Sequence, residues 1–378
     1  MRQIFIGLLL VSCVLVMSCR SGAGGRCMDA LDGIDAIVMQ EISEGHIPGA
    51  VVLAGRPGDV LYHKAFGMAV QEPYRQQMLR DAVFDLASLT KPVATATSIM
   101  ILVDRGRMRL DDNVGKYLPA FGCAGKEEAE IRHLLTHTSG LPAYTSAAEL
   151  QQECGENCTE AVIEKICSLE ALDPPGVKFR YSCLGYITLA KIVEVVSGVR
   201  LDSFSRSNVF LPLGMYQTRF NPPASWRGRV AATEIVEGNV LRGTVHDPLA
   251  RLGGGVSGNA GVFSTAGDLA VYCSMLLNDG VHEGDRILSN RAVEMLTKAQ
   301  SHGRAFGFDV GSAYAWVKGS YASTRAYCHT GYTGTSIVCD PEAQTYLIIL
   351  TNRVHPDDNG STRSLRTQVA NVVFKACR

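Results

Sequence analysis

The chain has 378 residues, of which 36 are lysine or arginine and 37 are aspartate or glutamate, so its formal net charge is −1. This balance provides no basic field for nucleic acid, and we expect no nucleic-acid partner. With 46% hydrophobic and 19% charged residues, the chain can bury a sizeable core, which excludes disordered, coiled-coil and collagen-like proteins. Its twelve cysteines favour a compartment outside the reducing cytoplasm.

The N-terminus has the layout of a signal peptide. Arg2 precedes an apolar run over residues 4–17, and a small residue, Ser18, stands directly before Cys19. The run is shorter than the ~20 residues that a membrane-spanning helix needs. Residues 16–19 (VMSC) resemble a bacterial lipobox.

We therefore expect residues 1–18 to be a signal peptide, and residues 19–27 to be a lipidated N-terminus and tether. The lipid would be carried by the Cys19 sulfur and would anchor an exported protein to a membrane. Two alternatives remain open: ordinary secretion with Cys19 unmodified, and an uncleaved anchor.

The two ends of the body show strand patterns with a helix beside them. Residues 34–44 have helical spacing, and residues 50–69 form two β-rich runs around a turn at 56–59. Near the C-terminus, β patterns occur at 312–317, 336–339 and 345–350, and a final helix is expected over 361–377.

The middle of the chain is dominated by helical patterns, at 88–105, 186–197 and 268–278. The predicted fold class is therefore α/β (α+β), with an antiparallel sheet built from the N- and C-terminal segments, helices flanking it, and a largely helical inserted region.

We expect neither a cofactor nor a metal. Cys154, Cys158 and Cys167 lack both a nearby histidine and paired C-x-x-C spacing, so a local disulfide or free thiols are favoured.

A candidate nucleophile opens the first central helix. Ser88 and Lys91 are three residues apart, which places both side chains on one face of the first turn. A serine needs a base or a proton relay within reach to become a nucleophile. Because S-x-x-K tetrapeptides are common by chance, this spacing alone also fits an exposed serine and a solvated lysine.

Two later segments strengthen the catalytic interpretation. They are Tyr181-Ser182-Cys183, just before a helix, and His329-Thr330-Gly331, just before a strand. With Ser88-Leu89-Thr90-Lys91, they resemble, in order, the S-x-x-K, Y-x-N and K-T-G motifs of the serine β-lactamase-related family. That family includes class C β-lactamases, D-alanyl-D-alanine carboxypeptidases, D-amino-acid peptidases and esterases. Further similar segments are LLTHTSGL at 134–141, GGGVSGNAG at 253–261 and LTNR at 350–353.

The resemblance covers about residues 28–375, so we expect one β-lactamase/transpeptidase-like hydrolase domain over 28–378. It implies that Ser88 attacks a carbonyl to form an acyl-enzyme and that Tyr181 is the general base. Lys91 would keep both poised, because a phenol serves as a base only beside a positive charge. The oxyanion hole would consist of the backbone N–H groups of Ser88 and Tyr332.

The chain departs from the family's motifs at two positions that would bind substrate together with Thr330 and Gly331. Cys183 stands where the family has asparagine, which removes an amide donor and acceptor. His329 replaces lysine, which exchanges a permanent cation for an imidazole. Both changes weaken recognition of a β-lactam or a peptide carboxylate. A Cys183–Cys328 disulfide is disfavoured, because Cys328 points away from His329 along a strand.

Two functions from different classes follow. The first is an exported serine hydrolase acting on amide or ester bonds, in peptidoglycan-derived or D-amino-acid peptides or in small esters, with a β-lactamase or penicillin-binding carboxypeptidase as its alternative. The second is a lipoprotein that binds peptidoglycan fragments without turnover, which the changes at Cys183 and His329 motivate.

His137 is expected to be a buried structural residue. His246-Asp247 is expected to be a loop contact near the cleft.

Overall fold

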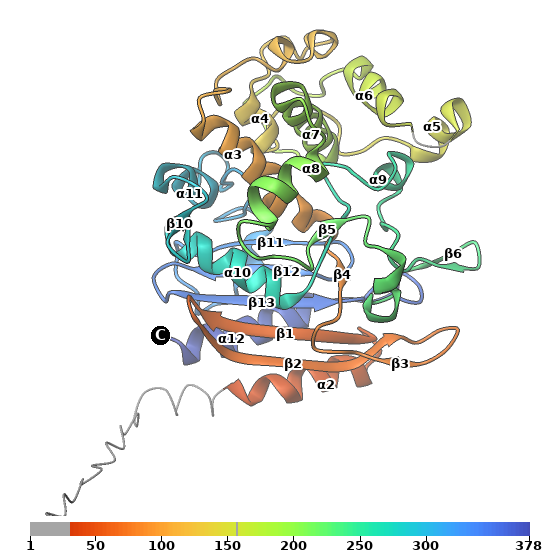
Figure 1. Ribbon diagram of the computed structural model, residues 1–378, viewed down its shortest axis with the longest axis vertical. Helices are drawn as coiled ribbons and strands as arrows, with labels where there is room; N and C mark the ends of the chain where they lie inside the picture. The colour runs from red at the N-terminus through yellow and green to blue at the C-terminus, as the bar shows by residue number, and fades with distance from the viewer. Residues whose placement is uncertain (1–30, 156–157) are drawn as a thin grey trace, which may run out of the picture.

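The computed structural model describes residues 31–155 and 158–378, so the predicted signal peptide, Cys19 and the tether lie outside the described residues. Figure 1 shows a sheet in the lower half of the molecule, two helices beneath it, and a mainly helical region above it. None of the helices in the described ranges has the length and apolar character needed to cross a membrane.

The main sheet confirms the prediction that both ends of the chain build it. Strands β1 (Gly49–Arg56) and β2 (Asp59–Val70) come from the N-terminal side, and β11 (Tyr327–Thr330), β12 (Ser336–Asp340) and β13 (Thr345–Thr351) from the C-terminal side. The strand order is β11-β12-β13-β1-β2-β3, where β3 is Gln76–Gln77, and the pairing is antiparallel. Red-orange and blue strands therefore lie side by side in Figure 1.

The sheet is buried on both faces, so alternate side chains of β1 enter two different apolar cores. Val52 packs with α2 (Gly33–Ser43) and α12 (Arg363–Ala376) beneath the sheet, whereas Val51 packs into the larger core above it. Each fully buried aliphatic side chain of this size contributes about 1.5–3 kcal/mol to folding. The two layers hold the sheet, and therefore the edge strand β11, in a fixed position.

The inserted region is largely helical, as predicted. Its helices are α3 (Thr97–Asp104), α4 (Ile131–Leu135), α5 (Ala147–Cys154), α6 (Thr159–Ser168), α7 (Cys183–Ser197), α8 (Leu201–Ser205), α9 (Pro248–Leu252), α10 (Ala266–Leu277) and α11 (Asn290–Thr297). A small sheet with the order β4-β8-β5 connects this region to the main one, through β4 (Phe84–Asp85), β8 (Val262–Ser264) and β5 (Arg219–Phe220). Two short hairpins complete it, β6 (Ile235–Val236) with β7 (Asn239–Val240) and β9 (Val281–His282) with β10 (Asp285–Arg286).

The strand expected at 312–317 is wrong. This segment forms a turn followed by a 3-10 helix, η7 (Ala315–Lys318). The Ser312 hydroxyl donates to the Asp309 carboxylate and accepts the Tyr314 N–H at 3.1 Å, a side-chain turn that competes with strand pairing. Ala315 and Val317 are nevertheless buried in the core beneath the sheet, which explains the apolar alternation that indicated a strand.

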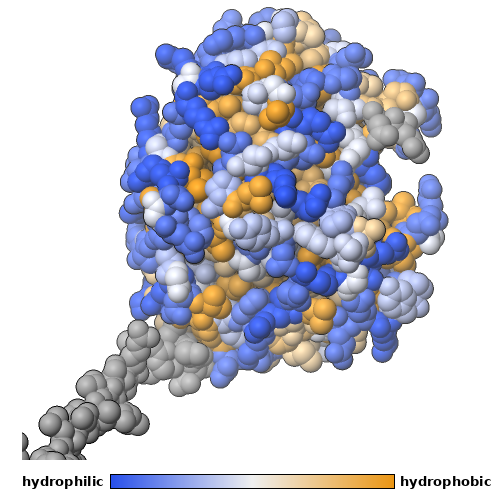
Figure 2. Space-filling view, in the orientation of Figure 1, coloured by the Kyte–Doolittle hydropathy of each residue, from blue (hydrophilic) through white to orange (hydrophobic). Residues whose placement is uncertain are grey.

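Cys154 and Cys158 form a disulfide, which confirms the local-disulfide interpretation, and Cys167 takes no part in it. Cys183 and Cys328 are unbonded to each other, and Cys328 lies in the core beneath the sheet. The surface visible in Figure 2 carries apolar side chains in small groups among polar ones.

Candidate active site

Ser88 lies at the junction between the small sheet and the first central helical segment. It belongs to a 3-10 turn, η1 (Ala87–Leu89), which follows β4 and leads through a π-helical turn, η2 (Lys91–Ala96), into α3. Ala87 has φ of +45°, which an L-residue rarely adopts, and its N–H donates to the Asp85 carboxylate at 2.9 Å. Such strained backbone gathers at functional sites. Ser88 is half-buried between fully buried neighbours.

Lys91 is fully buried and confirms the one-face placement expected from the i, i+3 spacing. Its Nζ donates to Ser88 Oγ at 3.0 Å and to the backbone oxygen of Asn259 at 3.1 Å, and it lies 3.6 Å from Cys183 Sγ. Burial lowers the pKa of Lys91, but the neighbouring Cys183 and Tyr181 outweigh it and hold the pKa above its ordinary value. This raised pKa favours the charged form of Lys91 beside Ser88.

Tyr181 lies beside this lysine, whose Nζ is 5.0 Å from the centre of the Tyr181 ring. The chain after Tyr181 is held by the loop that follows α4, because Ser182 N–H donates to His137 Nδ1 at 3.1 Å and Cys183 N–H to the Ala143 oxygen at 2.9 Å. The His137 ring also stacks on Tyr181, with 4.3 Å between centroids. The local fold thus fixes the phenol by its backbone and by its ring.

His137 is structural, as predicted. It is buried with φ of +58°, and burial, followed by the charges of Arg304 and Lys91, holds its pKa well below the ordinary value. It is therefore neutral, with Nδ1 as the acceptor that orients Ser182.

The turn after β11 is tied to the segment that carries Ser88. Thr333 Oγ1 donates to the Asp85 backbone oxygen at 2.7 Å, and Thr335 Oγ1 to that of Leu86 at 3.0 Å. The approach leaves no room for a side chain at Gly331, where a Cβ would lie 2.4 Å from the Leu86 oxygen. Within the described part of the chain, the backbone N–H of Tyr332 has no hydrogen-bond acceptor, so it remains available to a substrate oxyanion.

His329 stands where the family motif has lysine, and its ring lies 6.3 Å from that of Tyr181. It is buried, and its Nδ1 lies 3.0 Å from the Thr330 oxygen, to which it donates when neutral. Burial, followed by the charge of Arg304, holds the pKa of His329 well below its ordinary value. The third motif therefore presents a neutral imidazole, while Thr330 at the end of β11 remains partly exposed.

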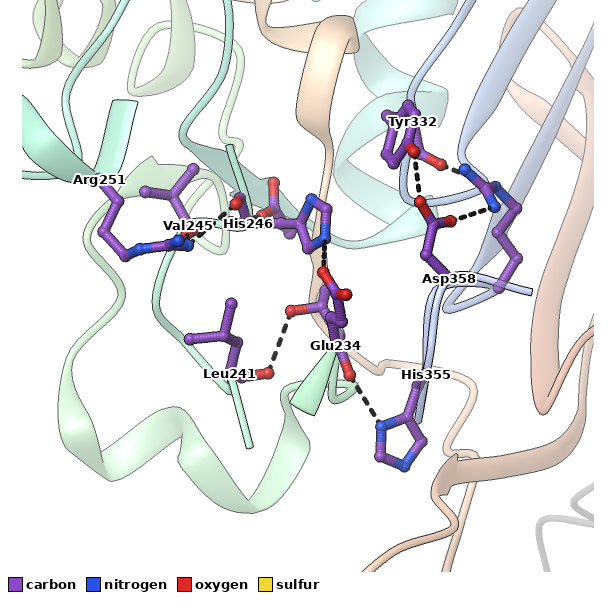
Figure 3. A network of polar contacts seen from close by, with 11 residues as sticks. Glu234, Leu241, Val245, His246, Arg251, Tyr332, His355 and Asp358 are labelled. Carbon is purple, nitrogen blue, oxygen red and sulfur yellow. Dashed lines mark hydrogen bonds and ion pairs between the residues drawn. The ribbon is translucent and has the colours of Figure 1, made fainter. Parts of the chain in front are cut away.

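The exposed Tyr332 ring, in the turn after β11, contacts several neighbouring side chains (Figure 3). His246 stacks on Tyr332 at 5.7 Å between centroids, and the Arg353 guanidinium lies 4.6 Å from the centre of the same ring. The Tyr332 hydroxyl donates to Asp358, and His246 contacts Glu234 at 2.9 Å. His246 is therefore a loop contact, as predicted, and its partner is Tyr332 in the turn after β11.

The glycine-rich loop at 253–261 packs against Lys91. The Asn259 backbone oxygen accepts a hydrogen bond from Lys91 Nζ, and the Gly258 backbone oxygen accepts one from Thr95 Oγ1 at 2.7 Å. A Cβ at Gly258 would lie 1.9 Å from the Tyr186 oxygen, so the loop can pass this close only as glycine. The 253–261 loop therefore packs closely against both Lys91 and the start of α7.

The structure thus brings Ser88, Lys91, Tyr181, Cys183 and His329 into one region. Three contributors were not expected from the sequence: the Asp85 carboxylate, the Asn259 carbonyl and the buried Arg304. Arg304 alone leaves a signal in the sequence, as a lone cation in the glycine- and phenylalanine-rich segment GRAFGF at 303–308.

The buried Lys91, Tyr181 and the backbone N–H of Tyr332 surround Ser88, which follows the strained Ala87, and this arrangement is that of a serine hydrolase of the β-lactamase type. Comparisons with known proteins agree. The model of the Beta-lactamase family matches residues 34–371. The chain is 30% identical to an Escherichia coli (strain K12) protein named "Putative D-alanyl-D-alanine carboxypeptidase", over 93% of this chain and 91% of the relative.

Two further comparisons are consistent with this. An N-acetylmuramyl-L-alanine amidase of Bacillus subtilis (strain 168) is 28% identical, over 86% of this chain and 82% of the relative. The solved structure of EstCE1, a hydrolase with promiscuous acyltransferase activity, is 25% identical with a TM-score of 0.75, over 92% of this chain and 99% of that one. The chain therefore belongs to the Beta-lactamase family, which confirms the resemblance and the predicted fold class.

Proposed function

We propose that the protein is an exported serine hydrolase that cleaves amide or ester bonds through an acyl-enzyme on Ser88. One observation carries this proposal: the 3.0 Å hydrogen bond from the buried Lys91 to Ser88, with Tyr181 beside the same ammonium group. The natural substrates we propose are peptidoglycan-derived or D-amino-acid peptides, or small esters.

In this mechanism Tyr181 takes the proton of Ser88 as Oγ attacks the substrate carbonyl. The oxygen of the tetrahedral intermediate is stabilised by the N–H groups of Ser88 and Tyr332. The proton then passes from Tyr181 to the leaving amine or alcohol, and the carbonyl re-forms on Ser88. Water, deprotonated by Tyr181, attacks the acyl-enzyme, and Ser88 recovers its proton. Lys91 remains charged throughout and stabilises the anionic oxygens on either side of it.

The substrate class is proposed from two observations. The names of the relatives, a carboxypeptidase and an amidase, point to peptidoglycan peptides. The neutral His329 and the thiol of Cys183 bind a substrate carboxylate more weakly than the family's lysine and asparagine would. This favours substrates that carry an uncharged group beside the scissile amide or ester bond. A β-lactamase or penicillin-binding carboxypeptidase is therefore the alternative.

A pair of active-site probes tests the proposal. We expect a fluorescent fluorophosphonate to label the protein at Ser88, and mass spectrometry can map the adduct. A labelled penicillin should react weakly. The Ser88→Ala variant is the control and should lose the label. Absence of any adduct at Ser88 with either probe would overturn the acyl-enzyme proposal, and strong penicillin labelling would favour the penicillin-binding alternative.

We also propose that the body is held outside the cytoplasm by a lipid on Cys19. The Cys154–Cys158 disulfide supports an oxidising compartment, because such bonds persist there. In cells fed an alkyne fatty acid, the full chain should carry the label in the membrane fraction. Cys19→Ser should lose both label and membrane association, while Cys123→Ser, at an exposed thiol of the body, should keep them. An unlabelled wild-type chain in the soluble fraction would contradict the anchor.

A further inference from the structure

Arg304 is a fully buried cation for which the mechanism above has no use. Its Nη1 forms an ion pair with Asp309 at 2.5 Å, and both side chains are shielded from solvent. A buried ion pair adds little to stability on balance, because the loss of hydration offsets the attraction. Its presence next to an active site therefore calls for a functional explanation.

The guanidinium lies beside the aromatic rings of Tyr181 and Phe179. Its central carbon lies 5.9 Å from the centre of the Tyr181 ring and 5.9 Å from that of Phe179, within the range of a cation–π contact. Asp309 exchanges two backbone hydrogen bonds with Cys328, of 2.8 and 2.9 Å, immediately before His329. The ion pair is thereby attached to the strand that carries the third motif.

Two fixed cations face Tyr181, and Arg304 is the second of them. Lys91 is the first. His137 and His329 are both neutral, since burial and then the Arg304 charge hold each pKa well below its ordinary value. The other titratable groups around the ring are Cys183, Tyr186, Asp309 and Tyr314. Of these, Asp309 is paired with Arg304, and the phenols and the thiol are acids that supply no positive charge.

We propose that Arg304 is a positioning residue for the reaction. It lies in the 303–309 segment and supplies the positive charge that the third motif lacks at His329. Acting through Tyr181, it stabilises the phenolate form of the ring, which is the form that can accept the proton of Ser88. This inference rests on the proposed role of Tyr181. It explains how the chain keeps two cations around the phenol while its third motif carries a neutral side chain.

The test uses the rate of fluorophosphonate labelling of Ser88 between pH 6 and pH 10, which requires no knowledge of the natural substrate. For Arg304→Gln, whose amide can still donate to Asp309, we expect labelling at pH 7 to fall about tenfold. The rising limb of the pH–rate profile should move up by about one pH unit, with the wild-type rate regained on the alkaline side. Arg304→Lys retains the charge and should restore the limb to its wild-type position.

The matched control is Arg242→Gln, because Arg242 is also buried but bonds to Val230, Tyr74 and Gln76 instead of the site. It should lower the melting temperature and leave the pH profile in place. If Arg304→Gln fails to fold, the double variant R304Q/D309N removes both charges and should move the limb in the same direction by a smaller amount, because the Asp309 carboxylate no longer opposes the phenolate. An unshifted profile with Ser88 still labelled overturns this inference alone, whereas a wild type unlabelled at Ser88 overturns the proposed function with it.

Discussion

Replacing Lys91 by methionine should slow acylation of Ser88 by about 10³-fold or more, because members of a catalytic unit act together and losing one disables the rest. The ammonium group is the only described cation within hydrogen-bonding distance of Ser88 Oγ, at 3.0 Å. Methionine fills a similar volume, so the fold should survive with the Asn259 oxygen left without its donor. Stopped-flow or gel-based labelling with fluorophosphonate measures the rate.

Lys191→Met is the matched control. Lys191 lies on α7, which also carries Cys183, and it forms ion pairs with Glu160 of α6 and Glu194 of α7. It should label at the wild-type rate. Circular dichroism and thermal melting of both variants separate loss of chemistry from loss of fold. A Lys91→Met protein that labels within a few-fold of the wild type would remove Lys91 from the proton relay.

Replacing Tyr181 by phenylalanine should lower the acylation rate by about 10²- to 10⁴-fold, the usual contribution of a positioned general base. The ring would keep its stacking on His137 at 4.3 Å and its contact with Lys91, so only the phenol oxygen is lost. Deacylation should slow as well, because the same oxygen activates the water. Single-turnover hydrolysis of a 4-nitrophenyl ester separates the two steps.

Tyr216→Phe serves as the comparison. Tyr216 is 70% exposed, so this substitution removes the same phenol oxygen from the surface of the protein. It should leave both steps unchanged. Full activity of Tyr181→Phe would assign the base to Lys91, and the raised pKa of that lysine makes such an outcome unexpected.

The contrast between His329 and Arg304 shows what a motif comparison leaves out. Counting residue types at three motifs gives the site one lysine fewer than the S-x-x-K, Y-x-N and K-T-G pattern of the family, which suggests weaker electrostatics. In the structure, however, a buried arginine some 25 positions upstream lies near the same phenol. Charge around a catalytic group therefore depends on all the segments packed against it, not on the motifs alone.

Local patterns predicted most of the elements and failed where side-chain chemistry overrode them. The hairpin, the strands at 336–339 and 345–350, and the terminal helices follow from apolar periodicity and turn residues. At 312–317 the same alternation was misleading, because Ser312 closes a turn on Asp309. The alternation at Ala315 and Val317 reflects burial beneath the sheet in a 3-10 helix, which periodicity over six residues does not separate from a strand.

By itself the sequence determined the fold class and the family, and it predicted Ser88, Lys91 and Tyr181 as catalytic residues, because these depend on periodicity and on short motifs whose order the chain preserves. Only the tertiary structure decided the electrostatics of the site. The neutral state of His329, the cation at Arg304 and the carbonyl of Asn259 depend on burial and on distances between segments far apart in the chain. Such distances are set by the packing of the sheet against the helical region, and no local pattern encodes them.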